Sequence, residues 1–333
     1  MKVTITAAAI AGALISSASF AVAAEPCGEI SIAELNWPSA GIAAWVDRII
    51  LEEGYGCTVD LLSGDTVSAI DTITSAGRPD IIPEFWFEST TPALQDAVAA
   101  GKVSFAAPLL REGGVQGWWV PKYLVDQNPE ITTVEAALAH PELFPSPADA
   151  TVGAIFSCPD GWVCRDATEN LFRAFSAEDA GFRLIDPSSS AALKQSIVDA
   201  FEKQQGWLGY YWAPTALLGD YDMVKLSFGV EFDKTEWDRC TVQPDCSDPK
   251  PNAYPVSAVY TLVTDALEEG HPDLMGYLGV RTWDNKTVST VLAWQQENNA
   301  TNAEAARYFL KEFPNVWHAW LPAFAADKVE RTL

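Results

Sequence analysis

Strand-like and helix-like segments alternate over the first part of the chain, and this order constrains the fold more than any other feature. Residues 29–35 are apolar and β-branched, as in a strand, and segments 57–62 and 79–86 have the same character. Apolar residues recur every three or four positions between Ile42 and Ile50, as on one face of a helix, and residues 66–76 fit a second helix. A strand–helix–strand–helix–strand order predicts parallel β–α–β units.

The same order returns in the middle of the chain. Residues 151–156 resemble a strand, 167–175 and 190–203 fit helices, and 206–211 fit the strand that follows. A chain of 333 residues is too long for one small core and suits two lobes. We therefore predict an α/β fold in which each lobe is a mostly parallel sheet flanked by helices, with a helical tail from about Ala258.

A long irregular segment, residues 229–255, is rich in Asp and Pro and precedes the helical tail. A loop of this length is usually functional or tied down. Its acidic residues could hold a calcium ion, although their spacing does not match an EF-hand loop. The sequence predicts no metal site here and leaves calcium as an open alternative.

The first residues have the pattern of an export signal. Lys2 supplies a positive charge, residues 3–20 are small and apolar apart from Thr and Ser, and the AVA triplet ending at Ala23 is an A-x-A cleavage site. We predict a signal peptide over residues 1–24, cleaved near Ala23 or Ala24. Because no other apolar run approaches the length of a membrane span, the remainder is expected to be exported and soluble.

Six cysteines, an even number in a chain with an export signal, point to disulfides. Two pairs lie six residues apart, which closes small loops, and the other two cysteines begin neighbouring predicted strands. The predicted pairs are Cys27–Cys57, Cys158–Cys164 and Cys240–Cys246. Metal–thiolate binding has less support because no C-x-x-C spacing occurs.

The chain is strongly acidic, with 45 acidic and 21 basic residues and a formal net charge of -24. Such a charge is repelled by nucleic acid and by anionic lipid surfaces, so neither is an expected partner. Its long-range field favours a cationic or zwitterionic partner. The alternative is that the acidity only supports solubility in a salty medium.

The sequence contains no convincing catalytic constellation. Its three histidines form no H-E-x-x-H motif, and neither a G-x-S-x-G elbow nor a phosphate-binding loop occurs. Carboxylates are abundant enough to supply a glycosidase pair, but a solvated acidic surface accounts for them more simply. The sequence therefore predicts a binding protein without a cofactor rather than an enzyme, with a secreted hydrolase as the alternative.

Tryptophan is abundant, with 13 residues, and several of them follow predicted strands. Those at strand ends or in the loops after them are Trp37, Trp86, Trp118, Trp119, Trp162 and Trp212. In open α/β sheets this edge is where ligands bind. Converging indole faces suit a cation that carries methyl groups, at about 0.5–2 kcal/mol per face. The alternatives are a sugar platform, which also needs many hydrogen-bonding side chains, and simple packing of the hinge between lobes.

The segment SCPDGWVCR, residues 157–165, adds a site for an anion. A disulfide between its two cysteines would close a small ring, and a helix is predicted just after it. The backbone N–H groups of Trp162, Val163 and Cys164 should then point into the cleft near a helix N-terminus, where an anion binds. An aromatic cage beside an anion site fits a betaine, which has a methylated cation at one end and a carboxylate at the other.

Three motifs resemble one protein family. The loop CPDGWVC, the strand end YYWAP and the strand PDIIPEFW are similar to segments of the periplasmic substrate-binding proteins of ABC importers for glycine betaine, proline betaine and choline. The resemblance covers essentially the whole chain after the signal peptide. It implies a periplasmic-binding-protein fold with two lobes, 25–116 plus 223–333 and 117–222, which close on a ligand in the cleft. It also implies a periplasmic monomer that docks on a membrane permease.

The resemblance carries over residue by residue to cage indoles and amide donors. The implied cage and donors are Trp86, Trp162, Trp212, Val163 and Cys164. Trp37 and one of Trp118 and Trp119 are expected as further walls. Both members of that pair cannot line the cleft because adjacent strand residues face opposite sides.

Glu84, two residues before a cage tryptophan, bears on which ligand is bound. Its carboxylate could hydrogen-bond a hydroxyl or an N-oxide, which would indicate choline or trimethylamine N-oxide, and it could repel a carboxylate. The alternative is a solvated acid at a strand end. Dimethylsulfoniopropionate, a sulfonium analogue of betaine, fits the same cage. The sequence thus predicts a class of ligand, methylated onium compounds, rather than one compound.

Overall fold

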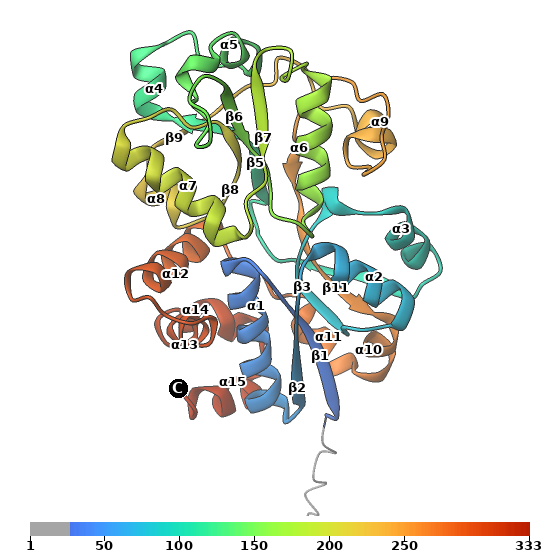
Figure 1. Ribbon diagram of the computed structural model, residues 1–333. Helices are drawn as coiled ribbons and strands as arrows, with labels where there is room; N and C mark the ends of the chain where they lie inside the picture. The colour runs from blue at the N-terminus through green and yellow to red at the C-terminus, as the bar shows by residue number, and fades with distance from the viewer. Residues whose placement is uncertain (1–26) are drawn as a thin grey trace, which may run out of the picture.

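The structure is a computed structural model and describes residues 27–333. The proposed export signal, residues 1–24, lies outside the described residues. Within them, no helix is both long enough and apolar enough to cross a bilayer. The chain forms two lobes, one above the other, and each lobe is built on its own sheet (Figure 1).

The first sheet contains the strands predicted near the N-terminus and has the order β2-β1-β3-β11-β4. Its strands are β1 (Glu29–Leu35), β2 (Thr58–Gly64), β3 (Ile81–Trp86), β4 (Val103–Pro108) and β11 (Val259–Thr264). β1 pairs in parallel with both β2 and β3, as the predicted β–α–β units require. β11 joins from the far end of the sequence and runs antiparallel to β3 and β4.

The second sheet has the order β10-β5-β8-β6-β7, with β9 paired to β5. Its strands are β5 (Gly114–Pro121), β6 (Gly153–Phe156), β7 (Phe182–Ile185), β8 (Gly209–Ala213), β9 (Met223–Lys225) and β10 (Val256–Ser257). β6 is parallel to β7 and β8, whereas β5 is antiparallel to β8. Both sheets are therefore mixed, rather than mostly parallel as predicted. The parallel part of the second sheet includes β7, a strand that the sequence pattern does not predict.

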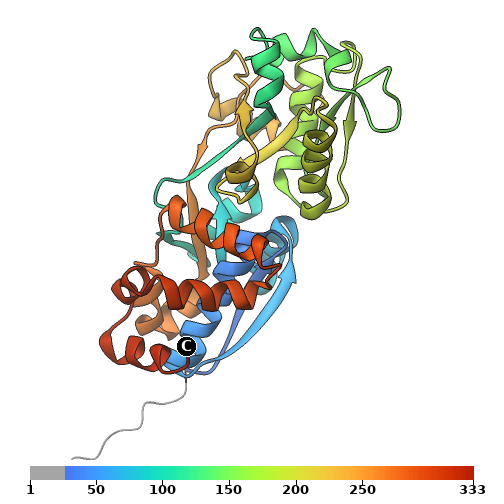
Figure 2. The ribbon, with the colours of Figure 1, turned by 90° about the vertical axis from the view of Figure 1, so that its left-hand side faces the viewer.

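Helices flank both sheets, and the helical tail packs on the first one (Figures 1 and 2). The first lobe carries α1 (Pro38–Ile49), α2 (Thr66–Ala76), α3 (Pro92–Ala99), α10 (Asp265–Gly270), α11 (Pro272–Leu278), α12 (Asn285–Glu297), α13 (Asn302–Glu312), α14 (Pro314–Trp317) and α15 (Ala323–Glu330). The second lobe carries α4 (Lys122–Gln127), α5 (Val134–Leu138), α6 (Val163–Ala174), α7 (Ser190–Lys203), α8 (Leu217–Asp220) and α9 (Lys234–Glu236). The predicted α/β architecture with two lobes is confirmed.

The chain passes between the lobes twice, after β4 and after β10, and β5 and β10 pair with each other at this junction. The proposed boundaries at 116/117 and 222/223 stay a prediction. Strand pairing adds that β9 and β10 still belong to the second sheet, so the chain rejoins the first sheet only at β11. At the junction, Gly114 lies against Trp86, and a Cβ atom there would overlap the indole ring.

Three disulfides join the predicted pairs, Cys27–Cys57, Cys158–Cys164 and Cys240–Cys246. The third disulfide closes a loop within the long segment 229–255, and a side chain of α6 holds the same segment by hydrogen bonds. There the Asn170 side-chain amide donates to the backbone carbonyls of Cys240 (2.9 Å), Thr241 (3.0 Å) and Gln243 (2.9 Å). In the same segment Asp233 caps α9 by accepting from the Thr235 and Glu236 amides. The segment is therefore held by hydrogen bonds as well as by its disulfide.

Candidate functional site

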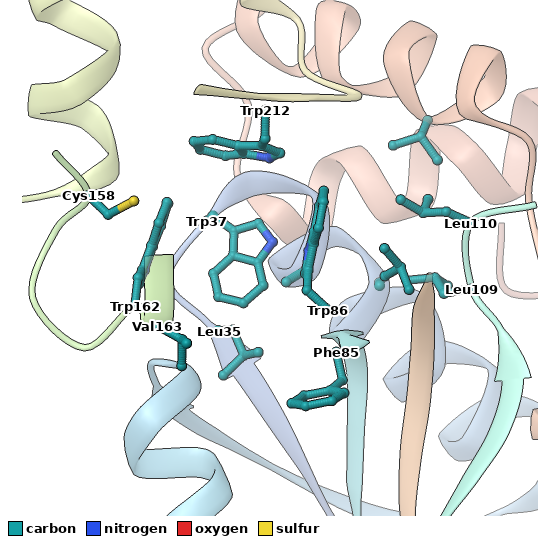
Figure 3. Packing of buried hydrophobic residues seen from close by; sticks show 14 of the residues in the cluster. Leu35, Trp37, Phe85, Trp86, Leu109, Leu110, Cys158, Trp162, Val163 and Trp212 are labelled. Atoms are coloured by element: carbon teal, nitrogen blue, oxygen red, sulfur yellow. The ribbon is translucent and has the colours of Figure 1, made fainter. Parts of the chain in front are cut away.

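Four tryptophan side chains enclose a small cavity between the lobes. Figure 3 shows Trp162 and Trp86 on opposite sides of the hollow, Trp212 across its top and Trp37 behind it. The cavity measures about 40 Å³, and each of these residues is only 5–9% exposed. The remaining lining comes from Thr66, Ser89, Gln116, Val163, Cys164 and Tyr210. No residue that lines the cavity carries a charged side chain.

The four indoles come from the carboxyl ends of strands in both sheets. Trp37 follows β1 and immediately precedes Pro38, the first residue of α1. Trp86 is the last residue of β3, and Trp212 stands at the end of β8, two residues before Pro214. Trp162 caps the N-terminus of α6 in the loop that follows β6. This edge of an α/β sheet is the usual ligand site, and here the edges of two sheets face each other.

The rings meet edge to face, as aromatic pairs prefer. The Trp162 ring lies 5.4 Å from that of Trp37 at 75° and 5.1 Å from that of Trp212 at 80°. Nearly perpendicular walls of this kind present π faces to the hollow from several directions. The structure thus brings together the four tryptophans that the sequence analysis placed at or beside the cage: Trp37, Trp86, Trp162 and Trp212.

Helix α6 begins at Val163, directly after Trp162, and not four residues later as the sequence pattern predicts. The correction matters because it places the amides of Val163 and Cys164 in the first turn, where helical N–H groups have no partner within the helix. In residues 27–333 neither amide has an acceptor. Both residues line the cavity, so a helix N-terminus with free donors meets the aromatic cage.

A second helix N-terminus, from the other lobe, reaches the same cavity. Thr66 is the first residue of α2, and its amide has no acceptor within the described part of the chain. Asp65 caps this helix by accepting from the Ser68 amide at 2.9 Å. The next amide, that of Val67, donates across the cleft to the carbonyl of Gly161 at 3.1 Å. The sequence pattern predicts this helix but not its role, because nothing local places it opposite α6.

Trp118 and Trp119 do not line the cavity, contrary to the expectation that one of them would. Trp118 is fully buried and packs on Phe228 with ring centres 5.3 Å apart. The Trp119 indole donates to the backbone carbonyl of Tyr211 at 2.9 Å. The β5 residue that reaches the cavity is Gln116. Trp118 shares its side of the strand but stands two residues, about 7 Å, further along.

Gln116 belongs to a polar chain that the sequence did not reveal. Its side-chain carbonyl accepts from the Tyr210 hydroxyl at 2.8 Å, and its amide nitrogen donates to the Ser257 hydroxyl at 2.6 Å. The chain therefore joins β8, β5 and β10 at the junction of the lobes. Burial raises the pKa of the Tyr210 hydroxyl well above its usual value, so this residue stays a neutral donor.

Glu84 is neither solvated nor part of the cavity wall. It is completely buried behind the cage, where its Oε1 atom accepts from the indole nitrogens of Trp37 at 2.7 Å and Trp86 at 3.0 Å. The Ser39 hydroxyl donates to the same oxygen at 3.0 Å. Burial raises the pKa of this carboxyl, and the three hydrogen bonds oppose that rise. Because the indoles stand between Glu84 and the hollow, direct contact with a ligand is not its role.

A larger cavity of about 760 Å³ lies next to the cage and shares Trp37 and Trp212 with it. Across it the lobes are joined by side chains. The Trp162 indole donates to the Asn36 side chain at 2.6 Å, and Lys194 donates to Gln296 at 2.5 Å. These contacts connect the residue before α6 to the residue after β1, and α7 of one lobe to α12 of the other. The lobes are therefore drawn together around the cage.

Comparison with known proteins agrees with this geometry. The family model described as the substrate binding domain of ABC-type glycine betaine transport system matches residues 28–312. No curated protein sequence matches the chain.

Solved structures support the same fold. A glycine betaine, L-proline-binding protein (ProX) from Borrelia burgdorferi is 16% identical, with 90% of this chain and 99% of that one covered and a TM-score of 0.71. A choline-binding protein of an ABC transporter in complex with choline is 14% identical, with 92% and 98% covered and a TM-score of 0.72. Lactococcal OpuAC, in a closed form with glycine betaine, is 19% identical, with 89% and 100% covered and a TM-score of 0.66. With its match over residues 28–312, the chain belongs to the family of substrate-binding domains of ABC-type glycine betaine transport systems.

Proposed function

We propose that the protein captures a methylated onium osmolyte of the glycine betaine class in its tryptophan cage and delivers it to the membrane permease of an ABC importer. The observation that carries this proposal is the cavity of four indoles without a charged side chain in its wall. The π faces of such a wall attract a cation, and the indole rings exclude water from around the methyl groups of that cation. A simple ammonium ion, by contrast, calls for a carboxylate in the wall.

The opposite end of the ligand is held by backbone amides. The first turns of α2 and α6 bring the free N–H groups of Thr66, Val163 and Cys164 to the same cavity. Helix N-termini attract anions through these donors and through the helix dipole. Zwitterions therefore fit best: glycine betaine, proline betaine and dimethylsulfoniopropionate each carry a carboxylate. Choline has the cationic end alone, and trimethylamine N-oxide has its negative oxygen directly on the nitrogen instead of a carboxylate.

A sugar is a poorer fit. Sugar recognition needs many hydrogen-bonding side chains around a stacking platform, and the cavity wall offers Thr66, Ser89, Gln116 and Tyr210. Two of these, Gln116 and Tyr210, already form a hydrogen bond with each other.

The same proposal covers location and partners. An export signal over residues 1–24 would place the protein in the periplasm, where the three disulfides are stable. The protein would act as a monomer whose closed form docks on the permease, with lobe one at 25–116 plus 223–333 and lobe two at 117–222. No catalytic step and no cofactor are part of the proposal.

The test is a ligand panel measured by isothermal calorimetry and by thermal shift. We expect micromolar or tighter binding of at least one of glycine betaine, choline, trimethylamine N-oxide and dimethylsulfoniopropionate. At a hundred times Kd, such a ligand raises the free energy of unfolding by about 2.7 kcal/mol. Maltose serves as the sugar in the same panel. Absence of heat with all four onium compounds would contradict the proposal, and binding of maltose alone would favour the sugar alternative.

The amide site can be tested by Val163→Pro. Proline is tolerated at the first position of a helix, and Trp162, with φ −99° and ψ 131°, already has the extended conformation that precedes proline. The variant therefore removes one N–H group while keeping α6. A hydrogen bond to a charged group contributes about 1.5–3 kcal/mol, so we expect glycine betaine to bind about 10–100-fold more weakly. Choline, which has no carboxylate, should change less than about threefold.

The matched control for this variant is Ala323→Pro, which removes the first amide of α15 at the far end of lobe one. It should leave both affinities unchanged. Equal losses for glycine betaine and choline in Val163→Pro would mean that the cage itself is damaged. Unchanged glycine betaine affinity would remove the Val163 amide from the anion site.

A further inference from the structure

The Glu84 carboxylate, directly behind the cage, connects two of its walls. Glu84 lies on β3 and is 0% exposed. A single oxygen, Oε1, accepts from both the Trp37 and the Trp86 indole nitrogens. Trp37 comes from the segment before α1 and Trp86 from the end of β3. The shared hydrogen bonds to Glu84 therefore fix the two rings relative to each other. The orientation of both walls thus depends on one acceptor atom.

The hydrogen bonds also indicate the charge state of Glu84. Its three neighbours on Oε1, two indole N–H groups and the Ser39 hydroxyl, all act as donors. A protonated carboxyl would have to place its proton on Oε2, which is buried and has no partner in residues 27–333. The ionised form accepts from all three donors, and its cost is the buried Oε2 atom, which has no donor and accounts for the burial that raises the pKa of this carboxyl. A bound cation one ring away would stabilise this form further.

Other buried charges nearby do not cancel that of Glu84. The Arg281 guanidinium is the closest buried cation in this part of lobe one, and it pairs with Asp47 at 2.9 Å. Asp47 also accepts from the Tyr277 hydroxyl at 2.5 Å, and Arg281 donates to Thr261 at 2.8 Å. Arg281 and Asp47 therefore form a neutral pair. Arg281 therefore leaves the charge of Glu84 uncompensated behind a cage whose own wall is uncharged. A second carboxyl, that of Glu88, lies near the wall residues Ser89 and Tyr210, and burial raises its pKa as well.

We infer that Glu84 is a positioning residue that fixes Trp37 and Trp86 and whose buried negative charge makes the cage selective for cations over neutral groups of the same shape. The inference rests on the proposed function and adds the source of its charge selectivity. A carboxylate that accepts from an indole N–H also pushes electron density into the ring, which strengthens the negative π face turned to the ligand. The acid acts through the rings and never touches the ligand.

The positioning part is tested without a ligand, by the indole ¹H–¹⁵N signals of Glu84→Gln. In the wild type the Trp37 and Trp86 signals should lie downfield, as expected for donors to a carboxylate. In Glu84→Gln both should move upfield because an amide carbonyl is a weaker acceptor. The Trp162 signal, whose partner is the Asn36 side chain, should stay in place. Unmoved Trp37 and Trp86 signals would overturn the positioning role.

Glu34→Gln is the matched control. Glu34 also accepts from an indole, that of Trp45 at 2.9 Å, but this ring does not line the cage. Its substitution should move the Trp45 signal and leave ligand affinity unchanged. It therefore separates the general effect of losing an indole–carboxylate bond from the effect of losing one behind the cage.

The charge part is tested with pairs of ligands in which the quaternary nitrogen of the onium group is replaced by a quaternary carbon. Glycine betaine is compared with 3,3-dimethylbutanoate, and choline with 3,3-dimethylbutan-1-ol, at pH 8. We expect Glu84→Gln to weaken binding of glycine betaine and choline by on the order of tenfold. The alcohol 3,3-dimethylbutan-1-ol should change less than about twofold, and 3,3-dimethylbutanoate, which is an anion, should bind no more weakly than to the wild type.

The outcomes separate the proposals. A wild-type protein that binds none of the onium compounds contradicts the proposed function, whereas the indole signals still decide the positioning role. Equal losses for the onium compounds and for their carbon analogues would overturn the charge role, as would unchanged affinity in Glu84→Gln. If that variant fails to fold, Ser39→Ala removes one donor to Glu84 while keeping both rings and the charge. It should move the same two indole signals by a smaller amount, and unmoved signals there would overturn the inference.

Discussion

Replacing Trp212 with alanine is expected to abolish measurable ligand binding while the protein stays folded. The ring forms the top wall of the cage and meets Trp162 edge to face at 5.1 Å. Its loss removes one cation–π face, about 0.5–2 kcal/mol, and opens the cage to water. It also frees the Trp162 ring to turn. Together these effects should raise Kd at least about 100-fold, or 2.7 kcal/mol.

The measurement is calorimetry with the best ligand of the panel, together with circular dichroism melting of the ligand-free protein. Trp294→Ala is the control, since Trp294 stacks on Tyr308 at 4.2 Å in the helical tail and does not line the cage. That variant should lose stability and keep its affinity. Affinity close to the wild-type value in Trp212→Ala would remove this ring from the binding site.

Local sequence patterns predict the features that depend on nearby residues, namely the strands, the helices and the disulfide pairs. The alternation of strands and helices predicts the parallel β1–β2 and β6–β8 pairs, because period and turn residues act over a few positions. It does not predict β7, a strand of four residues that pairs with β6. Cysteine spacing predicted three disulfides that the structure contains. The aromatic motifs predicted which tryptophans stand at strand ends, and the structure brings four of them to one cavity. That these rings bind a ligand stays a prediction.

What the sequence could not show depends on contacts between distant segments. From sequence alone, Glu84 is an acidic residue near the end of a strand. In the fold it is buried by Trp37 and Ser39, which lie more than forty residues away in the sequence and donate hydrogen bonds to it. Likewise, Thr66 is predicted only as the start of a helix. Its amide becomes part of the cavity because the second lobe places the start of α6 next to it. Trp118 and Gln116 share one side of β5, and only the position of that strand relative to β8 decides which of them reaches the cavity.

Closure of the lobes depends on the absence of a side chain at Gly161. This residue has a φ of +82°, and a Cβ atom on it would overlap the Asp65 carboxylate of the other lobe. Asp65 cannot simply turn away, because its Oδ1 atom caps α2 through the Ser68 amide. The added methyl group must therefore hold the lobes apart and break the Val67–Gly161 hydrogen bond across the cleft.

Gly161→Ala is therefore expected to weaken ligand binding about 10–100-fold, since overpacking of this kind costs about 1–3 kcal/mol in the closed form alone. Small-angle scattering should show that saturating ligand no longer compacts the variant as fully as the wild type. Gly229→Ala is the matched control. Gly229 has a φ of +72° with no atom near its Cβ position, so it reports backbone strain without a clash.

The decisive step is rescue by a second substitution. Asp65→Gly removes the side chain that the new methyl group meets, and glycine is an acceptable residue at a helix N-cap. If the clash between lobes is the cause, Gly161→Ala with Asp65→Gly should recover most of the affinity lost by Gly161→Ala, measured against Asp65→Gly alone. If affinity stays low, the defect lies in the backbone of the disulfide loop and so in the Val163 and Cys164 amides. Rescue would show that the cage owes its affinity to closure as well as to its aromatic walls.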